Sequence, residues 1–197
     1  YLRFLPAANW NGSAPTLTVA LIDSSTTVTT NATVDVSTRG GTTAYSSSTV
    51  TLSNTVNAVN DAPVASGSAT LTAIDEDTAN PSGATVSSLF SSNFSDSTDT
   101  VSGGSSANTL AGIAITSYTR DATKGEWQYS TNGSSWTTIG SSISAASSSL
   151  TFKSTDYLRF LPAANWNGSA PTLTVALIDS STTVTTNATV DVSTRGG

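Results

Sequence analysis

The sequence predicts an all-β protein, built as an antiparallel β-sandwich, and three observations lead to this prediction. Val, Ile and Thr recur in short runs that alternate with polar residues, a pattern typical of strands with one buried face. The pair Asn132-Gly133 separates two of these runs, and both residue types accept the positive φ of a tight hairpin turn. No segment shows helical periodicity with start and stop signals, apart from a turn near 86–94.

The expected strands are runs of β-branched and aromatic residues that lie between turn residues. The most convincing is 16–22, together with its copy at 172–178. The runs 126–130 and 135–139 flank the hairpin turn, and 157–161 ends at a proline. The other candidates are 33–36 with its copy at 189–192, 48–53, 55–59, 69–74 and 110–118.

One segment occurs twice without a single change. Residues 1–41 are identical to residues 157–197, which gives a period of 157 − 1 = 156 residues. A β-sandwich tolerates wide sequence variation at constant structure, so an identity of this length indicates recent tandem duplication. We therefore expect the chain to be a window of a longer array of near-identical units. Such arrays usually supply length, stiffness or multivalency.

The strongest candidate for a domain boundary is the segment VNDAPV at 59–64. Pro63 cannot donate a ladder hydrogen bond, and it favours an extended conformation at Ala62, so we interpret the segment as a linker. Residues 1–60 are then the C-terminal part of one repeat unit, and 61–197 are the N-terminal and central part of the next. The second unit lacks a counterpart of 42–60. We expect 42–59 to complete a sandwich whose other strands resemble 157–197, within the chain or by head-to-tail strand exchange between chains.

Composition excludes several classes of function. The chain contains neither Cys nor His, so it has no disulfide, no thiolate metal site and no histidine base. Seven basic residues against thirteen acidic ones give a net charge of −6, which argues against a nucleic-acid partner. A glycosidase needs a suitably placed pair of carboxylates, and neither Glu76 nor Glu126 lies in a segment that suggests a pocket. We expect no enzymatic activity, and no apolar run is long enough to insert into a membrane.

Acidic residues point to a calcium site. Asp75, Glu76 and Asp77 are adjacent carboxylates that repel one another unless a cation or solvent compensates, and Ca²⁺ prefers six to eight oxygen ligands. The linker residues reach this cluster if 69–74 runs back towards the start of its unit. The predicted ligands are Asp61, Glu76, Asp77, Asp75, Asn60, Asp23 at the end of 16–22, and its copy Asp179. The alternative is a solvated acidic turn.

A second acidic pair, Asp96 and Asp99, lies in a stretch rich in Ser, Thr and Gly. The spacing of three residues allows the two carboxylates to share an ion through a turn. An exposed loop with Asx-turns explains the same spacing.

Several motifs together resemble the cadherin-like and Ig-like repeats of giant RTX-type bacterial surface adhesins. They are PAANWNG at 162–168 followed by a strand and Asp179, the NDAPV linker at 60–64, the DEDT segment at 75–78 and GEWQYSTNG at 125–133. The resemblance covers essentially the whole chain. It implies an extracellular structural extender at the bacterial cell surface, which projects a distal ligand-binding domain. It also implies that calcium at or near the inter-repeat junctions makes the array rigid, with neighbouring repeats as partners.

The aromatic residues leave a different function open. Trp127, Tyr129, Trp136 and Trp166 either pack in the core or form an exposed platform on which sugars stack. In the second case the chain would be a glycan- or cell-binding module that acts by avidity. An ice-binding surface would need a regular Thr array, and here Thr is mixed irregularly with Ser, Val and Asn.

Overall fold

The computed structural model describes residues 1–196 and divides into two compact units. The first unit is Tyr1–Val59 with Val101–Ser105, and the second is Asn60–Thr100 with the residues from Ser106 to the end of the described chain. Both are built from antiparallel strands with little helix, so the all-β prediction is confirmed. None of the described helices has the length and apolar character needed to cross a membrane.

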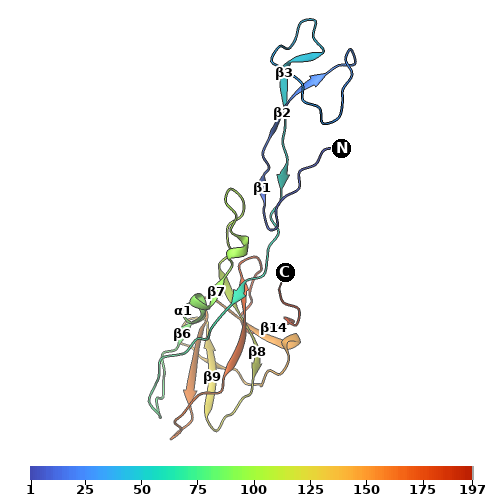
Figure 1. The fold of residues 1–197 in the computed structure, drawn as a ribbon. Coiled ribbons are helices and arrows are strands. Elements are labelled where there is room, and N and C mark those ends of the chain that lie inside the picture. Colours follow the sequence, from blue (N-terminus) through green and yellow to red (C-terminus); the bar gives the residue numbers. More distant parts are fainter. Residues whose placement is uncertain (197) are drawn as a thin grey trace. The chain divides into compact units, whose positions relative to one another are not determined.

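One four-stranded sheet of the second unit has the order β13-β8-β11-β14. Its strands are β13 (Leu173–Asp179), β8 (Leu110–Tyr118), β11 (Ser149–Lys153) and β14 (Ala188–Val190) (Figure 1). In β8, Ile113 lies between Leu177 of β13 and Phe152 of β11. The β8 strand lies in the middle of this sheet, and its consecutive residues 112–116 are buried, so both of its faces are covered, which accounts for its nearly continuous apolar sequence.

The other four-stranded sheet has the order β10-β9-β12-β6. Its strands are β10 (Thr137–Thr138), β9 (Gly125–Ser130), β12 (Tyr157–Pro162) and β6 (Ala84–Thr85). The predicted hairpin is confirmed, because β9 pairs with β10 across the Asn132-Gly133 turn. Gly133 has the expected positive φ of 72°. The Asn132 side chain accepts hydrogen bonds from the backbone N–H groups of the two serines that follow Gly133.

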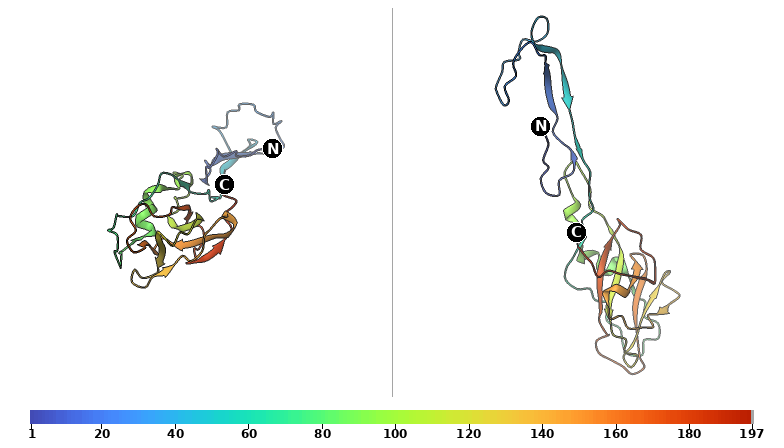
Figure 2. Two further views of the ribbon diagram at one scale, coloured as in Figure 1. Left: turned by 90° about the horizontal axis from the view of Figure 1, so that it is seen from below. Right: turned by 90° about the vertical axis from the view of Figure 1, so that its right-hand side faces the viewer.

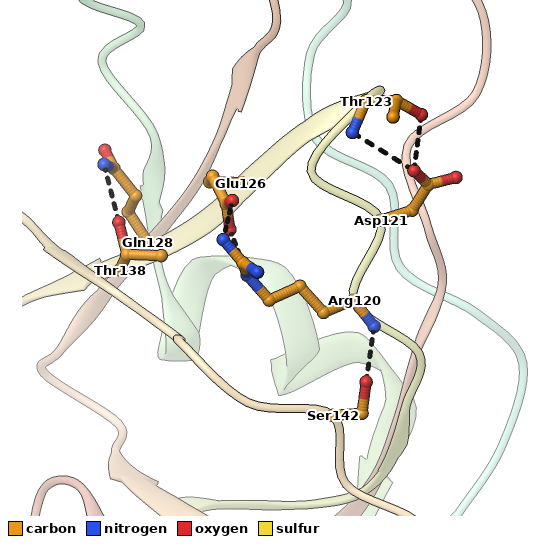
Figure 3. A network of polar contacts seen from close by, with 7 residues as sticks. All are labelled: Arg120, Asp121, Thr123, Glu126, Gln128, Thr138 and Ser142. Carbon is orange, nitrogen blue, oxygen red and sulfur yellow. Dashed lines mark hydrogen bonds and ion pairs between the residues drawn. The ribbon is translucent and has the colours of Figure 1, made fainter.

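The turn between β8 and β9 is held by side chains (Figure 3). Arg120 binds Glu126 through two hydrogen bonds, and the Asp121 carboxylate accepts from the backbone and hydroxyl of Thr123 at 3.2 and 2.6 Å. The turn ends at Gly125, whose φ is 138°. A Cβ atom there would lie 2.3 Å from the carbonyl oxygen of Leu161, so the neighbouring strand leaves room only for glycine.

The core of the second unit takes side chains from both sheets and from the single-turn helix α1 (Val86–Phe90). Thr85 caps this helix, since its hydroxyl accepts from the backbone N–H of Ser88 at 3.1 Å. The buried members are Val86, Ile113, Ile115, Tyr118, Ile139, Ile143, Phe152 and Leu158. Burial raises the pKa of the Tyr118 phenol. Burial of each large apolar side chain in this core stabilises the fold by about 1.5–3 kcal/mol.

The first unit contains two short antiparallel pairs. Strand β2 (Leu17–Ile22) pairs with β3 (Tyr45–Leu52), and β1 (Gly12–Ser13) pairs with β4 (Thr55–Val56). The β2–β3 pair is visible as blue and cyan strands in Figures 1 and 2. Residues of the segment 42–59 therefore pair within the chain, with the first copy of the duplicated segment. Many apolar side chains of this unit stay exposed.

The strand prediction is wrong in several details. The segment 69–74 forms no strand, and 33–36 forms none although part of its copy contributes β14. The strands β1, β6 and β11 were not expected, nor was the pair of β5 (Val64–Ala65) with β7 (Phe94–Ser95). These differences have one physical reason, because a strand requires a neighbour that offers a ladder of hydrogen bonds, and local sequence does not report that neighbour. The expected turn near 86–94 is α1 followed by the 3₁₀ helix η1 (Ser91–Asn93).

Candidate metal centre

A cluster of acidic and amide side chains lies at the start of the second unit, where four chain segments meet. Asn60 and Asp61 are its first residues. Asp96 precedes the 3₁₀ helix η2 (Ser97–Asp99) and Asp99 is its last residue, so both come from one helical turn. Asp179 ends β13 at a register shift, and Asn108 precedes β8. We call the six residues Asn60, Asp61, Asp96, Asp99, Asn108 and Asp179 the acidic cluster.

Asn108 connects most of the acidic cluster. Its side-chain N–H group donates to the Asn60 amide oxygen at 2.6 Å and to the Asp99 carboxylate at 3.5 Å, and its backbone N–H donates to Asp96 at 2.5 Å. The linker completes the arrangement, because the Asn60 amide donates to Asp179 at 3.3 Å. The Asp61 backbone N–H donates to Asp99 at 3.0 Å.

Three of the four carboxylates of the acidic cluster are buried, and Asp61 is half-buried. Asp96 is 5% exposed and Asp179 is 4% exposed, and Asp99 is buried as well. The Oδ1 atom of Asp96 has no hydrogen-bond partner, although it is fully shielded from solvent. Neither Asp96 nor Asp179 forms an ion pair with a lysine or arginine of the described residues. Burying an ionised carboxylate is costly unless a counter-charge or a metal compensates. The negative charge of the cluster therefore favours a bound cation.

The donor set fits a hard cation. Every potential ligand in the acidic cluster is a carboxylate or amide oxygen, which is the chemistry that Ca²⁺ prefers. Within residues 1–196, however, no three carboxylates are grouped closely enough to hold a metal by themselves. The amide N–H groups of Asn60 and Asn108 donate to Asp179 and Asp99. A cation at this cluster would need ligands from these amides as well as from the carboxylates, which requires the amide oxygen atoms to turn towards it.

The structure brings together only part of the predicted ligand set. Asn60, Asp61 and Asp179 share the acidic cluster, whereas Asp75, Glu76 and Asp77 are exposed elsewhere. The last two contact the NWNG turn: the backbone N–H of Asn165 donates to Asp77 at 2.7 Å, and the Asn167 amide donates to Glu76 at 3.1 Å. The NWNG turn lies before the start of β13, whereas Asp179 is the last residue of β13. A strand of seven residues extends about 23 Å, so the length of β13 separates the 75–77 carboxylates from the acidic cluster.

Asp23 belongs to the first unit and lies in a different environment from its copy Asp179. It is exposed and accepts hydrogen bonds from the backbone and hydroxyl of Ser25 at 2.8 and 2.5 Å. These bonds lower the pKa of the Asp23 carboxyl. A residue that corresponds to Asp96 one period of 156 residues earlier would lie before Tyr1, so this sequence contains no such partner for Asp23.

The prediction did not include Asp96, Asp99 and Asn108 among the ligands. The spacing of the two aspartates allowed a shared ion, but an exposed loop explained it equally well. The structure contradicts an exposed loop, because both carboxylates are buried, and the shared ion stays a prediction. Asn108 carried no local signal, since it is one more polar residue in a stretch of Ser, Thr, Gly and Asn. Its role depends on the approach of the linker and of β13.

The aromatic residues of the second unit mostly pack against one another. Trp127 donates its indole N–H to the Pro171 carbonyl at 2.6 Å, and its ring meets Phe160 edge to face at 5.6 Å. Phe160 also packs edge to face against Trp166, with ring centroids 5.8 Å apart. The Arg159 guanidinium lies over the Trp136 ring, 4.1 Å from its centroid. These contacts support the packing interpretation. The glycan-binding alternative stays a prediction.

Comparison with known proteins gives no relative for this chain. No protein-family model, no curated protein and no solved structure matches it. The duplicated segment and the acidic cluster are the features of this chain that point to a function.

Proposed function

We propose that the chain belongs to the extender region of a bacterial cell-surface adhesin, in which β-sandwich repeats stiffened by calcium project a distal ligand-binding domain. The observation that carries the proposal is the buried, unpartnered Oδ1 atom of Asp96. It lies in a cluster that also holds Asn60 and Asp61, the first residues of the second unit. A cation bound there would act on the linker itself.

The sandwich architecture is supported by the origin of the core. The two four-stranded sheets of the second unit both contribute buried side chains, with Ile113 and Phe152 from one sheet and Leu158 from the other. Two antiparallel sheets that share one core are the arrangement of Ig-like sandwiches. Tandem repetition is supported by the identity of residues 1–41 and 157–197.

Calcium would act by exchanging hydrogen bonds for ligand bonds. The carboxylates of Asp96, Asp99 and Asp179 supply the negative charge, and the amides of Asn60 and Asn108 supply neutral oxygen atoms. In exchange, the amide N–H groups that now donate within the cluster turn away. Because Asn60 is a ligand, the bound cation fixes the chain at the point where it leaves Val59. Each linker of an array fixed in this way would resist bending.

The mechanical role agrees with the composition. A chain without cysteine cannot use disulfides to stiffen an extracellular array, and a metal that binds only the folded state is an effective substitute. Charged residues make up only 10% of the chain, so its surface offers few features for specific recognition. Length and stiffness are functions that such a surface can serve.

Isothermal titration calorimetry of the full chain with Ca²⁺ tests the proposal. We expect saturable binding by the unaltered chain and at least a tenfold loss of affinity in Asp96→Asn, which removes one charge from the cluster. The matched control is Asp35→Asn, which removes an exposed carboxylate from the first unit. Absence of calcium uptake, or an equal loss in both variants, would contradict the proposal. Small-angle scattering of linked units should also show a more extended array in Ca²⁺ than in EDTA.

A further inference from the structure

Strand β13 forms one edge of its sheet, and the strand with the identical sequence in the first unit, β2, is paired with β3. Among the described strands its neighbour is β8. Residues 173–178 read LTVALI, and so do residues 17–22 of β2. The neighbour of β2 is β3, which pairs with it from Leu17 opposite Leu52 to Ile22 opposite Tyr45. The same six residues thus accept two different strands in the two copies.

The edge that β3 occupies on β2 corresponds to the edge that is free on β13. In the first copy, Leu21 and Asp23 direct their backbone N–H groups to Ser46 and Ala44, on the β3 side. In the second copy, the Thr174 carbonyl faces β8, since it accepts from the Thr116 hydroxyl at 3.2 Å. Backbone groups of successive strand residues point to opposite edges. The Ala111 carbonyl of β8 accepts from the Ser154 backbone N–H at 2.7 Å, on the β11 side, so Gly112 and Ala114 face β13. Their partners Ile178 and Ala176 therefore face β8, and Leu177, the copy of Leu21, points away from β8.

The side chains of β3 match this free edge. In the register observed with β2, Leu52 and Val50 would lie opposite Leu173 and Val175 of β13. Residues directly opposite in an antiparallel pair share one face of the sheet, and Leu173 and Val175 pack against the core. In the first unit Val50 is 51% exposed and Leu52 is 53% exposed.

A cavity along β13 provides the space. Its volume is about 380 Å³, and its walls include Pro63, Val175, Leu177 and Val192. It lies beside the linker and the C-terminal segment of the second unit, and its walls combine these apolar side chains with polar ones such as Ser181 and Arg195.

We propose that Tyr45–Leu52 of one molecule adds to the free edge of β13 in a second molecule. The acceptor sheet then has five strands, with the order β3 of the donor, β13, β8, β11 and β14. The exchange conserves backbone hydrogen bonds, because β3 leaves one LTVALI strand for an identical one. It adds burial, because only β13 belongs to a sheet with a packed core. The described residues hold one such donor strand and one such acceptor edge, so molecules joined in this way line up head to tail.

Sedimentation velocity of the full chain over a concentration series tests the assembly, with EDTA present so that calcium plays no part. We expect the mean mass to rise with concentration and Val50→Asp to abolish the rise, because it places a charge on the core face. Thr51→Asp is the matched control, since its side chain is exposed and lies on the opposite face, and it should retain assembly. A chain that stays monomeric at all concentrations, or equal assembly in both variants, would overturn the proposal.

Cross-linking tests the register. The chain has no cysteine, so a mixture of Thr51→Cys and Thr174→Cys molecules can form only disulfides between these sites. The proposed register puts the two residues opposite each other in a non-hydrogen-bonded pair, about 4.5 Å apart at Cα, which a disulfide can bridge. We expect a several-fold excess of the heterodimer over a mixture of Thr51→Cys with Thr137→Cys, another exposed strand residue. Equal yields would contradict the register.

Discussion

The duplicated segment takes up the same turns in both copies. Asn9 and its copy Asn165 have φ values of 56° and 55°, and Asn31 and its copy Asn187 have values of 60° and 57°. The edge-to-face ring pair of the first copy, with centroids 5.6 Å apart, recurs at 5.8 Å in the second. These features involve contacts within a few residues, so the local sequence is sufficient to form them.

The sheets of the two copies differ. Residues 157–162 form β12 between β9 and β6, whereas 1–6 form no strand. Leu158 is 1% exposed and its copy Leu2 is 73% exposed. Identical residues thus form the same turns in both copies, because a turn depends on local contacts. They form a strand only where a neighbouring strand is available to pair with them. Stability should therefore depend on the copy in which a residue is changed.

The largest expected difference between the copies concerns Leu158. We expect Leu158→Ala to lower the free energy of unfolding by about 2–5 kcal/mol, because it leaves a cavity in the core. The same change at Leu2 should have an effect close to zero. Urea denaturation of the two variants gives both values. Equal losses would mean that the first copy has a core of its own.

Arg159 and its copy Arg3 should show a smaller difference. The Arg159 guanidinium is buried and donates hydrogen bonds to Gln128, Asn80 and the Pro81 carbonyl at 2.6–2.9 Å. This burial lowers the pKa of Arg159. Arg159→Ala would leave these acceptors without their donor, at a cost of about 2–3 kcal/mol. Arg3 is exposed, so Arg3→Ala should be nearly neutral in the same denaturation experiment. A neutral Arg159→Ala would show that water replaces the guanidinium.

The smallest expected effect concerns turns that the copies share. Hydrogen bonds from Ser37 and Ser193 lower the pKa values of Asp35 and Asp191 below the usual 3.8. A lowered carboxyl pKa adds stability above the pKa of the unfolded chain, and this is lost as the pH falls through the folded pKa. Ser37→Ala and Ser193→Ala should raise the respective pKa values by similar amounts in an NMR titration. Unequal changes would show that tertiary structure reaches these turns.

The strand predictions succeeded where a segment carries its own signal. Residues 110–118 were predicted and form β8, and the Asn132-Gly133 hairpin forms as expected. The Ser- and Thr-rich strand β11 was missed because it is defined by its position between β8 and β14. Conversely, 69–74 has an apolar pattern but no strand neighbour.

The candidate site could be predicted only in part for a related reason. Asn60, Asp61 and Asp179 were singled out by the linker motif and by the end of a strand. Their partners Asp96, Asp99 and Asn108 come from a polar loop, and its burial depends on long-range packing. A string of adjacent carboxylates, such as 75–77, attracts attention in a sequence, yet in the structure these side chains lie exposed.

Asp179 and its copy Asp23 provide the most direct test of whether a cation holds the linker through the acidic cluster. The melting temperature of the full chain is measured in Ca²⁺ and in EDTA for the unaltered protein, Asp179→Asn and Asp23→Asn. Calcium at a hundred times its dissociation constant stabilises by about 2.7 kcal/mol. We predict a clear increase in the melting temperature for the unaltered protein and for Asp23→Asn, and little or none for Asp179→Asn. An unaltered protein that melts at the same temperature in Ca²⁺ and EDTA, or an Asp179→Asn variant that keeps the full increase, would contradict the account.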